Sequence, residues 1–474
     1  MSNAPVTGKG VAVASAVRRT RPPNTDLARL IEACGASHKS LAHRVNQLTR
    51  QAGIQTDYSH TSVANWCRRG MIPKHPMPQL LAQAISERLG RPVNLGEIGM
   101  GGAETINADV GLDFPRDPAD AVRVATTFWR SVNRRDFLTQ TGTGFAASAF
   151  TTPVTRWLVS PTDETADHQG SGQVGQADLD ELRDAADDAR RWDSKYGGGN
   201  WKANSVTDCL EHRAAPLLQG SFSDTVGREL FSVTAELSRL AGWTAFDVGQ
   251  HDAAQRHFVQ ALRLARAGGD VQLGCYVLTT MAMQALMRGF ASEAIDMAQG
   301  AFERARHDAV PRVLAFTKLI EARAHAREHN ARAASRALAA SEGLLGKADA
   351  DSGDEPGWID FYHHARLSAD AAEVFRDLKN PKMALAWNKQ AAAMPTGVFT
   401  RSVGMRLAIV GTAHLQARDL DHGLELGHRS VDILARVQST RAKDYVAEFN
   451  AALVPWRREP AVREFMQRTR DEAL

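Results

Sequence analysis

The segment 60–70 carries side chains that suit contact with a polyanion. Its hydroxyl and amide groups include Ser62 and Asn65, which can hydrogen-bond the edges of base pairs, and it ends in Arg68 and Arg69. Hydrogen bonds to base edges give sequence preference, whereas guanidinium and ammonium groups neutralise phosphates. Four further cations in this part of the chain are candidates for phosphate contacts: Lys39, Arg44, Arg50 and Lys74. These residue types predict an interface for double-stranded DNA.

The distribution of charge along the chain favours the same interpretation. The 474 residues carry a net charge of only +3. Residues 1–100, however, contain 13 Lys and Arg against 5 Asp and Glu, a local charge of +8, and the other 374 residues contain 44 against 49, or −5. A basic N-terminal part followed by a slightly acidic remainder is typical of a polyanion-binding module joined to another module.

Other motifs that could carry chemistry lack the context that the chemistry needs. Residues 142–147 spell G-x-G-x-x-A, but no strand pattern precedes them, as a dinucleotide site would require. The clustered histidines show no metal-ligand spacing, and the cysteines form no C-x-x-C pair; these residues are His363, His364, His414, His422, His428, Cys34, Cys67, Cys209 and Cys275. We therefore expect a binding protein with no catalytic site, no metal and no cofactor.

One motif raises the question of export. Residues 133–139 contain the pair Arg134-Arg135 and match a twin-arginine signal in their letters, but such signals work at the N-terminus. The apolar stretch that follows is interrupted by threonines, and no run of about 18 apolar residues could span a bilayer. Residues 1–21 show no secretory signal. We expect a cytoplasmic protein in which 133–159 forms an interdomain helix that packs on the second half of the chain. Export or membrane association through 133–159 is the weaker alternative.

Short helices are expected to position the basic residues of the N-terminal part. Asn24 or Thr25 can cap the first helix, and Ser37 can cap the second. The third contains Val63 and Trp66, three residues apart, as its buried anchors. A helix-turn-helix unit needs this layout, in which a short recognition helix is anchored by two or three apolar residues. The expected helices are 26–34, a second beginning at Ser37, 60–70 and 78–89.

The third helix and its flanks resemble a known family. Recognition segments of phage-repressor-like helix-turn-helix proteins commonly read S-x-x-x-[VI]-x-x-W-E-x-G followed by Pro, and residues 59–73 read SHTSVANWCRRGMIP. Three features depart from that pattern: Cys67 replaces the usual acid, one residue is added before Gly70, and the connection from Leu41 to Val63 is long. The resemblance implies DNA binding, and a helical subdomain that merely begins the fold is the alternative.

The second half of the chain contains an internal repeat of small residues. Gly242, Ala254, Phe258 and Ala261 are spaced 12, 4 and 3 apart, and the same spacing returns 40 residues later at 282, 294, 298 and 301. This spacing matches the tetratricopeptide hairpin, in which small residues let two helices pack closely. Related sets follow at 333–340, 372–391 and 411–430. One hairpin cannot bury its apolar face alone, so stacked hairpins are expected to share a core. A generic all-α bundle is the alternative.

A stack of such hairpins curls into a superhelix, and the first helix of each pair lines its inner groove. Six residues are expected there by register: Arg239, Trp243, Tyr276, Lys318, Arg366 and Arg376. Phe246 shares this expected face with Trp243. Cations and aromatic rings would suit an extended peptide and especially its carboxylate end. The alternative for each residue is that the ring belongs to the core or that the charge is solvated.

The sequence therefore predicts an all-α protein in four parts. These are a flexible N-terminus (1–23), a helix-turn-helix domain (24–100), a linker with one or two helices and a disordered stretch at 161–176 (101–177), and a tetratricopeptide-like repeat domain (178–474). This combination resembles actinomycete transcription regulators. The stretches that carry the resemblance include 240–243 (LAGW) and 356–358 (PGW), and within that group the chain is similar to Streptomyces proteins that hold back differentiation and antibiotic production.

The resemblance implies function as well as fold. It implies a DNA-binding regulator whose repeats bind a peptide or protein partner and form a homodimer. The layout is also similar to peptide-sensing regulators of Firmicutes, in which a peptide bound to the repeats alters how paired heads meet DNA. A scaffold protein that has the repeats but no specific DNA binding is the alternative.

Overall fold

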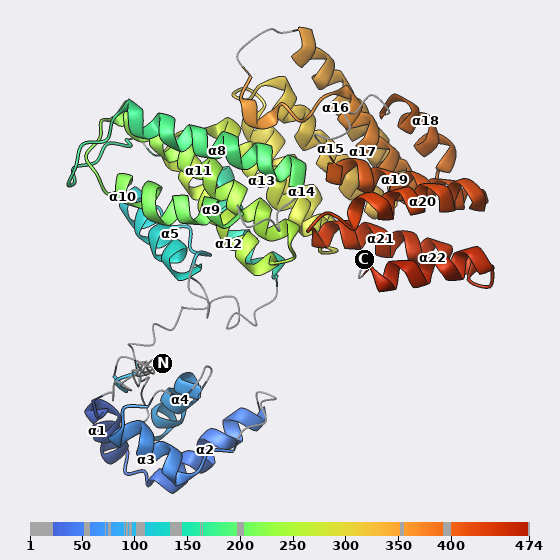
Figure 1. Cartoon of the computed structure of the whole chain (residues 1–474). Helices are drawn as coiled ribbons and strands as arrows, with labels where there is room; N and C mark the ends of the chain where they lie inside the picture. Colours follow the sequence, from blue (N-terminus) through green and yellow to red (C-terminus); the bar gives the residue numbers. More distant parts are fainter. Residues whose placement is uncertain are drawn as a thin grey trace, which may run out of the picture. The chain divides into compact units, whose positions relative to one another are not determined.

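A computed structural model describes residues 22–51, 57–71, 73, 77–89, 91, 93, 97–100, 110–132, 145–161, 163, 165–196, 203–350, 355–391 and 400–472 (Figure 1). The chain divides into two compact units, Met1–Asn107 and Ala108–Leu474. Both units are α-helical, as predicted, and the described residues form no strand, only isolated bridges. Lys74 and the Arg134-Arg135 pair lie outside the described residues.

The first unit contains four helices: α1 (Thr25–Ala33), α2 (His38–Gln51), α3 (His60–Arg68) and α4 (Met77–Leu89). Asn24 caps α1, because its side chain accepts a hydrogen bond from the Leu27 amide, and the Ser37 hydroxyl accepts one from Ser40 at the start of α2. Gly35, at φ +60°, lies in the left-handed region just after α1. Both predicted caps are confirmed.

Apolar side chains from all four helices form the core of the first unit. Leu27, Val45, Val63, Leu81 and Ile85 are each fully buried. Trp66 lies among them and meets the edge of the Tyr58 ring at a centroid distance of 5.3 Å. Because Val63 and Trp66 hold one face of α3 in this core, its remaining faces are left for other contacts.

The second unit is built mainly from five helical hairpins among its described residues. They are α11 (Asp224–Asp247) with α12 (His251–Ala267), α13 (Val271–Met287) with α14 (Ala291–Ala305), α15 (Pro311–Arg327) with α16 (Ala331–Ala350), α17 (His364–Asp377) with α18 (Pro381–Ala391), and α19 (Thr400–Gln416) with α20 (Leu420–Leu434). Each pair packs against the next, and α21 (Thr440–Leu453) and α22 (Pro460–Asp471) follow (Figure 1). The succession predicted from the repeat is confirmed.

The small residues of the repeat lie where the two helices of a hairpin approach most closely. A Cβ atom at Gly242 would lie 2.7 Å from the Phe258 ring, and one at Gly411 would lie 3.1 Å from the carbonyl oxygen of Gly423. Real Cβ atoms are essentially never found under 3.0 Å, so a larger residue at Gly242 would push the helices of the first hairpin apart. The spacing of small residues therefore reports on packing within each hairpin.

The described residues between 110 and 159 pack on the repeats, which the sequence predicted for 133–159 but not for the linker residues before it. Helix α5 (Pro118–Val132) and helix α7 (Thr151–Val159) both contact α12. The α12 side chains Arg256, Gln260 and Arg263 donate hydrogen bonds to backbone carbonyls between 110 and 116. Since Arg256 and Arg263 are almost fully buried, this segment covers polar groups that would otherwise face water.

The stretch 161–176 was expected to be disordered, and its described residues are not. His168 pairs with Phe222 and Gln173 pairs with Ser221 in isolated bridges. The Ala166 amide also donates a hydrogen bond to Asp224, at 2.7 Å. The composition suggested disorder because the stretch has few apolar residues, but backbone pairing with a distant segment supplies its order. It leads into α8 (Gln176–Tyr196), which packs on α11.

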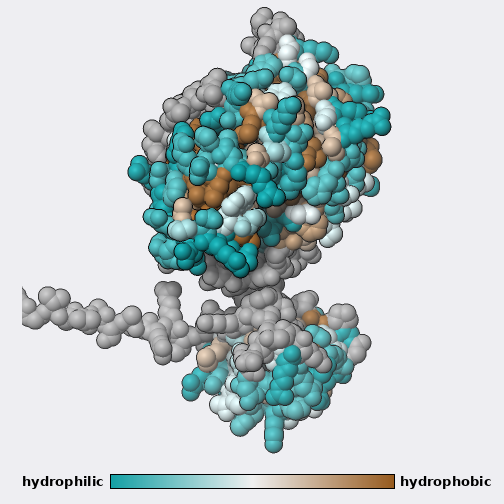
Figure 2. Space-filling view, turned by 90° about the vertical axis from the view of Figure 1, so that its right-hand side faces the viewer, coloured by the Kyte–Doolittle hydropathy of each residue, from teal (hydrophilic) through white to brown (hydrophobic). Residues whose placement is uncertain are grey.

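The face of the second unit shown in Figure 2 is mostly hydrophilic, and its hydrophobic residues occur in separate small patches. Among the helices of the described residues, none is long and apolar enough to cross a membrane.

Candidate functional site

Helix α3 presents the residues that we expected to contact DNA. Arg68 and Arg69 are exposed at its C-terminal end, and neither side chain forms a hydrogen bond or ion pair within the described part of the chain. Asn65 is half-buried, and its side-chain amide is also without a hydrogen bond there. The Ser62 hydroxyl accepts a hydrogen bond from the Ser59 amide at 3.3 Å, so it helps to close the start of the helix. Two cations and one free amide thus share a short helix.

The other candidate cations are not equivalent. Lys39 and Arg50 are exposed and form no ion pair with described residues. Arg44 is bound to Glu87 through two hydrogen bonds, from Nε at 2.7 Å and from Nη2 at 2.9 Å. This pair links α2 to α4 and raises the pKa of Arg44 while lowering that of Glu87. A phosphate would have to compete with a carboxylate for Arg44, which makes it a weaker candidate than the sequence indicated.

Two asparagines hold α3 in place, a role that the sequence analysis assigned to neither of them. Asn46 donates to Asp57 and to the carbonyl of Tyr58, and it accepts from the Tyr58 amide at 2.9 Å. The backbone amide of Asn24 donates to the carbonyl of Cys67 at 2.7 Å. These contacts fix both ends of α3. A buried asparagine on α2 was the one signal that could have indicated the first of them.

The second unit contains a cavity of about 670 Å³, which we call the arginine–aromatic pocket. Side chains from α8 and from the first helices of the hairpins line it, together with the turn η3 (Gly357–Ile359) and α21. Four residues predicted for the groove line the pocket: Arg239, Trp243, Tyr276 and Arg366. Its volume lies within the range of about 300–1,000 Å³ that is usual for small-ligand sites.

Aromatic rings form one wall of this pocket. Trp358 stacks on Tyr276, with ring centroids 4.8 Å apart and planes inclined by 11°. Phe316 and Phe361 continue the wall and meet edge to face at 5.3 Å. Trp243 lies apart from these rings, and its Nε1 donates to Asp193 at 3.1 Å. Sequence reasoning found Tyr276 and Trp243 but missed Trp358 and Phe361, because both precede α17 in a stretch without helical periodicity.

Six arginines line the pocket, and most of them are paired: Arg190, Arg191, Arg239, Arg366, Arg401 and Arg441. Arg401 reaches Asp193 at 3.0 Å and Asp247 at 2.7 Å, and Arg441 reaches Asp247 at 3.0 Å. Arg366 pairs with Asp370 at 2.7 Å, Arg191 with Asp188 at 2.6 Å, and Arg190 with Asp187 and Glu236. Arg239 is the exception among the six, since it forms no ion pair or hydrogen bond with the described residues.

The structure does not place the other two predicted groove residues in the pocket. Lys318 pairs with Glu321 at 2.7 Å and lies 4.0 Å above the ring of Phe302, a residue of α14. Arg376 is 3% exposed and belongs to a buried network. Register along one helix placed both residues on the groove face, but Lys318 pairs with Glu321 on its own helix and Arg376 pairs with Glu448 of α21. Phe246 is likewise fully buried.

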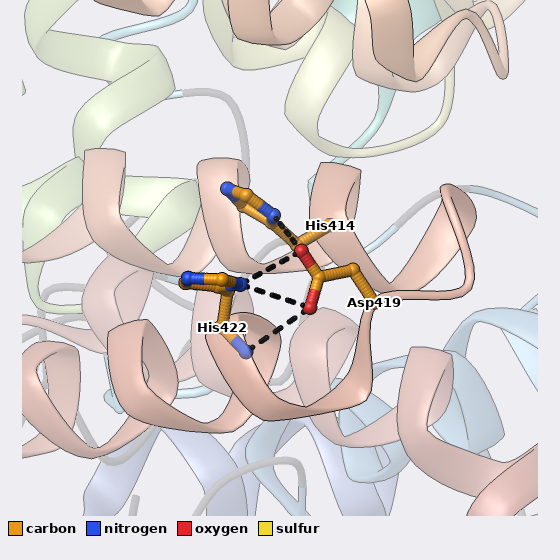
Figure 3. A group of neighbouring side chains, drawn as sticks. All are labelled: His414, Asp419 and His422. Atoms are coloured by element: carbon orange, nitrogen blue, oxygen red, sulfur yellow. Dashed lines mark hydrogen bonds and ion pairs between the residues drawn. The ribbon is translucent and has the colours of Figure 1, made fainter.

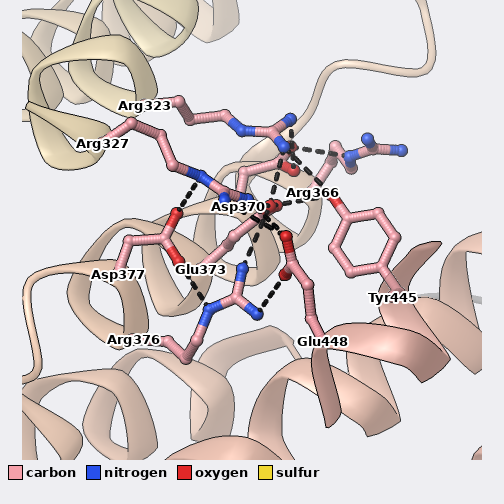
Figure 4. A network of polar contacts seen from close by, with 9 residues as sticks. All are labelled: Arg323, Arg327, Arg366, Asp370, Glu373, Arg376, Asp377, Tyr445 and Glu448. Atoms are coloured by element: carbon pink, nitrogen blue, oxygen red, sulfur yellow. Dashed lines mark hydrogen bonds and ion pairs between the residues drawn. The ribbon is translucent and has the colours of Figure 1, made fainter. Parts of the chain in front are cut away.

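The buried network that includes Arg376 joins α15, α17 and α21 (Figure 4). Its centre is Glu373, which accepts hydrogen bonds from Arg323 and from the Tyr445 hydroxyl, both at 2.8 Å. Glu448 of α21 accepts from Arg376 at 2.8 Å. The surrounding guanidinium groups, Arg323 above all, overcome the effect of burial and lower the pKa of Glu373 to about 2. This network is structural, because its charges satisfy one another.

A second polar cluster lies at the turn between α19 and α20 (Figure 3). His414 and His422 are each hydrogen-bonded through Nδ1 to the carboxylate of Asp419, at 3.0 and 2.9 Å. These are the described residues whose metal-ligand atoms gather within 4.8 Å of one another. The carboxylate also caps α20 by accepting from the His422 amide. Capping and the two imidazole contacts account for this arrangement without a metal.

The Asp419 cluster predicts a shifted histidine titration. The hydrogen bond from His422 to Asp419 and the charge of that carboxylate raise the pKa of His422 above 6.5, and Glu425 and Asp421 add to the effect. The resulting stabilisation is present below about pH 6.5 and is lost as the pH rises through the folded-state pKa. Asp419→Asn should therefore lower the pKa of His422 in an NMR titration. His428, whose pKa is lowered by burial, should not move, and an unchanged His422 would contradict this assignment.

Comparison with known proteins adds one similarity. The sequence model of one protein family, described as the SP15 N-terminal domain, matches residues 27–101. That range begins within α1 and ends beyond α4, so the similarity concerns the first unit. Neither the curated proteins nor the solved structures include one that matches the chain.

Proposed function

We propose that this protein is a DNA-binding transcription regulator whose first unit contacts DNA and whose second unit binds a peptide or protein partner. The observation that carries the proposal is the state of α3. One face of this helix is anchored by Val63 and Trp66, and the side chains of Arg68 and Arg69 at its C-terminal end have no partner among the described residues. A short anchored helix with free cations is what entry into a major groove requires.

The second unit supports the sensing half of the proposal. Stacked hairpins enclose the arginine–aromatic pocket, and cations with aromatic rings suit the recognition of a peptide end. One short recognition helix supplies little specificity, so we propose a homodimer on a two-fold DNA site. The resemblance to actinomycete regulators favours control of differentiation or secondary metabolism in the cytoplasm. A ligand could act by favouring one spacing of the paired first units over another.

Removing the two free arginines tests the DNA interface directly. In the double variant Arg68→Ala, Arg69→Ala we expect weaker binding to all duplexes and a salt dependence flatter by about 1.8 in log K against log salt, since each lost phosphate contact contributes about 0.9. Fluorescence anisotropy at several salt concentrations measures both quantities. The matched control is Arg332→Ala, Arg336→Ala, which removes the same charge from exposed positions on α16. Equal salt slopes for the two double variants would reject the assignment.

A selection of sheared genomic DNA on the full-length protein, repeated at two salt concentrations, tests the function as a whole. Enrichment of a few sites that share a two-fold motif is the result we expect. If random DNA is recovered and its recovery falls as the salt concentration rises, the first unit binds DNA through its charge without sequence specificity. In that case the scaffold function, in which the hairpins capture a protein partner, becomes the better interpretation.

A further inference from the structure

Arg239 is a buried cation that has no counter-ion among the residues that the structure describes. It is 3% exposed, and its Nε atom has no hydrogen-bond partner. The guanidinium group lies 4.7 Å from the centroid of the Tyr276 ring in the arginine–aromatic pocket. No ion pair or hydrogen bond to the described residues satisfies it. The other five arginines of the pocket each have a carboxylate partner, so Arg239 is the one guanidinium group of the six that lacks its own carboxylate among the described residues.

An unpaired buried guanidinium is energetically unfavourable. Taking a charge out of water is costly unless a partner compensates for it. The contact with Tyr276 compensates only in part, since a cation–π contact is weaker than the lost hydration of a buried charge. Arg190 adds repulsion: burial lowers its pKa, Asp187 opposes that effect, and the charge of Arg239 lowers the pKa further. Asp360, which also lines the pocket, opposes this repulsion at Arg190, but it forms no ion pair with Arg239, so the Arg239 guanidinium remains available to an added anion.

The rings around Arg239 indicate what should accompany that anion. Trp358 stacks on Tyr276, which is also the ring beneath Arg239. Phe316 and Phe361 lie next to this pair, with centroids 5.9 and 6.4 Å from Tyr276. A flat apolar group placed against this wall would bring a neighbouring negative charge to the guanidinium. Carboxylates match guanidinium geometry through two parallel hydrogen bonds.

We propose that the arginine–aromatic pocket binds a carboxylate that lies next to an aromatic ring, with Arg239 as the residue that recognises the carboxylate. This inference rests on the proposed role of the second unit as a ligand sensor, and it names the chemistry of the ligand. Two sources share that chemistry: the C-terminal residue of a peptide that ends in an aromatic amino acid, and a free aromatic carboxylic acid. The volume of about 670 Å³ admits either.

The test compares acids with their uncharged amides on the full chain, by isothermal titration calorimetry. The probes are N-acetyl-L-phenylalanine and the peptide Ala-Ala-Ala-Ala-Phe, each as the free acid and as the C-terminal amide. We expect at least one acid to bind at least about 30-fold more tightly than its amide, since loss of a buried charge partner has effects of that size. Binding of both acids points to a small acid, and binding of the peptide acid alone points to a peptide terminus.

Arg239→Met removes the charge and keeps a long apolar side chain. We expect it to abolish the preference for the acid and to leave the melting temperature of the ligand-free protein unchanged or higher, because the unpaired charge is costly. A structural arginine would instead lower the melting temperature when it is replaced. Arg336→Met, at an exposed position on α16, is the matched control and should keep the acid preference.

Three results would overturn the proposal: equal affinity for acids and amides, no binding of either acid at millimolar concentration, or full acid preference in Arg239→Met. The comparison of acids with amides uses the unaltered protein, so it holds whether or not that variant folds. DNA is absent from this experiment. Specific DNA selection with no acid binding would therefore refute the pocket ligand alone, and acid binding with no DNA selection would refute only the regulator.

Discussion

Replacing Glu373 with alanine is expected to destabilise the second unit by about 3–5 kcal/mol, because removal of one partner leaves buried charges uncompensated. Glu373 is 2% exposed and lies 2.8 Å from Arg323 and 3.5 Å from Arg376. The Tyr445 hydroxyl loses its acceptor in the same variant. Because these residues come from α15, α17 and α21, the change should loosen the contact among three elements and not one helix alone.

Urea denaturation followed by tryptophan fluorescence measures this effect. Every tryptophan except Trp66 lies in the second unit, so the signal reports mainly on that unit. Glu342→Ala, at an exposed position on α16, is the matched control and should change the free energy of unfolding by less than about 0.5 kcal/mol. If Glu373→Ala were no more harmful than this control, the network would not stabilise the fold.

The same carboxylate predicts a dependence of stability on pH. Its pKa is lowered from 4.5 to about 2 in the folded protein. The stabilisation it provides is therefore complete above about pH 4.5 and is lost as the pH falls toward 2. The unaltered protein should lose stability across this window, and Glu373→Gln, which cannot titrate there, should show a smaller slope. Equal slopes would indicate that other carboxylates dominate acid unfolding.

Asp247→Ala is expected to have the second large effect, again about 3–5 kcal/mol. Asp247 is fully buried at the end of α11. It accepts hydrogen bonds from Arg401 at 2.7 Å, from Ser439 at 2.9 Å and from Arg441 at 3.0 Å. One carboxylate thus connects the first hairpin with α19 and with the start of α21. Its removal leaves two buried guanidinium groups short of negative charge.

Because Arg401 and Arg441 line the arginine–aromatic pocket, Asp247→Ala should displace side chains of the pocket as well as lower the stability of the second unit. Urea denaturation measures the first effect, and the fluorescence of Trp243, which lies under Arg441 at 4.5 Å, is expected to change with the second. Asp247→Asn keeps the shape and one acceptor oxygen, so it should be milder. Asp296→Ala, at an exposed position on α14, is the matched control. Stability equal to that control would contradict the connecting role of Asp247.

The sequence by itself determined the helices, the hairpins and the surface of α3. These features depend on residues that are close in the sequence. Examples are the helical periodicity, the Asn24 cap, and the close contact of Gly242 with Phe258, 16 residues later. The same local pattern separated the buried from the exposed residues of α3, because Val63 and Trp66 must face the core and Arg68 then faces outward.

Only the tertiary structure decided which charges are free. Arg376 and Arg239 both lie on first helices of hairpins, yet Arg376 pairs with Glu448, 72 residues away, and Arg239 has no ion-pair partner in the part of the chain that the structure describes. Arg401 meets Asp193 across 208 residues. Such pairings depend on how far each hairpin turns relative to the last, and no local pattern records that angle. The buried charge of Arg239, on which ligand recognition is proposed to depend, follows from that geometry.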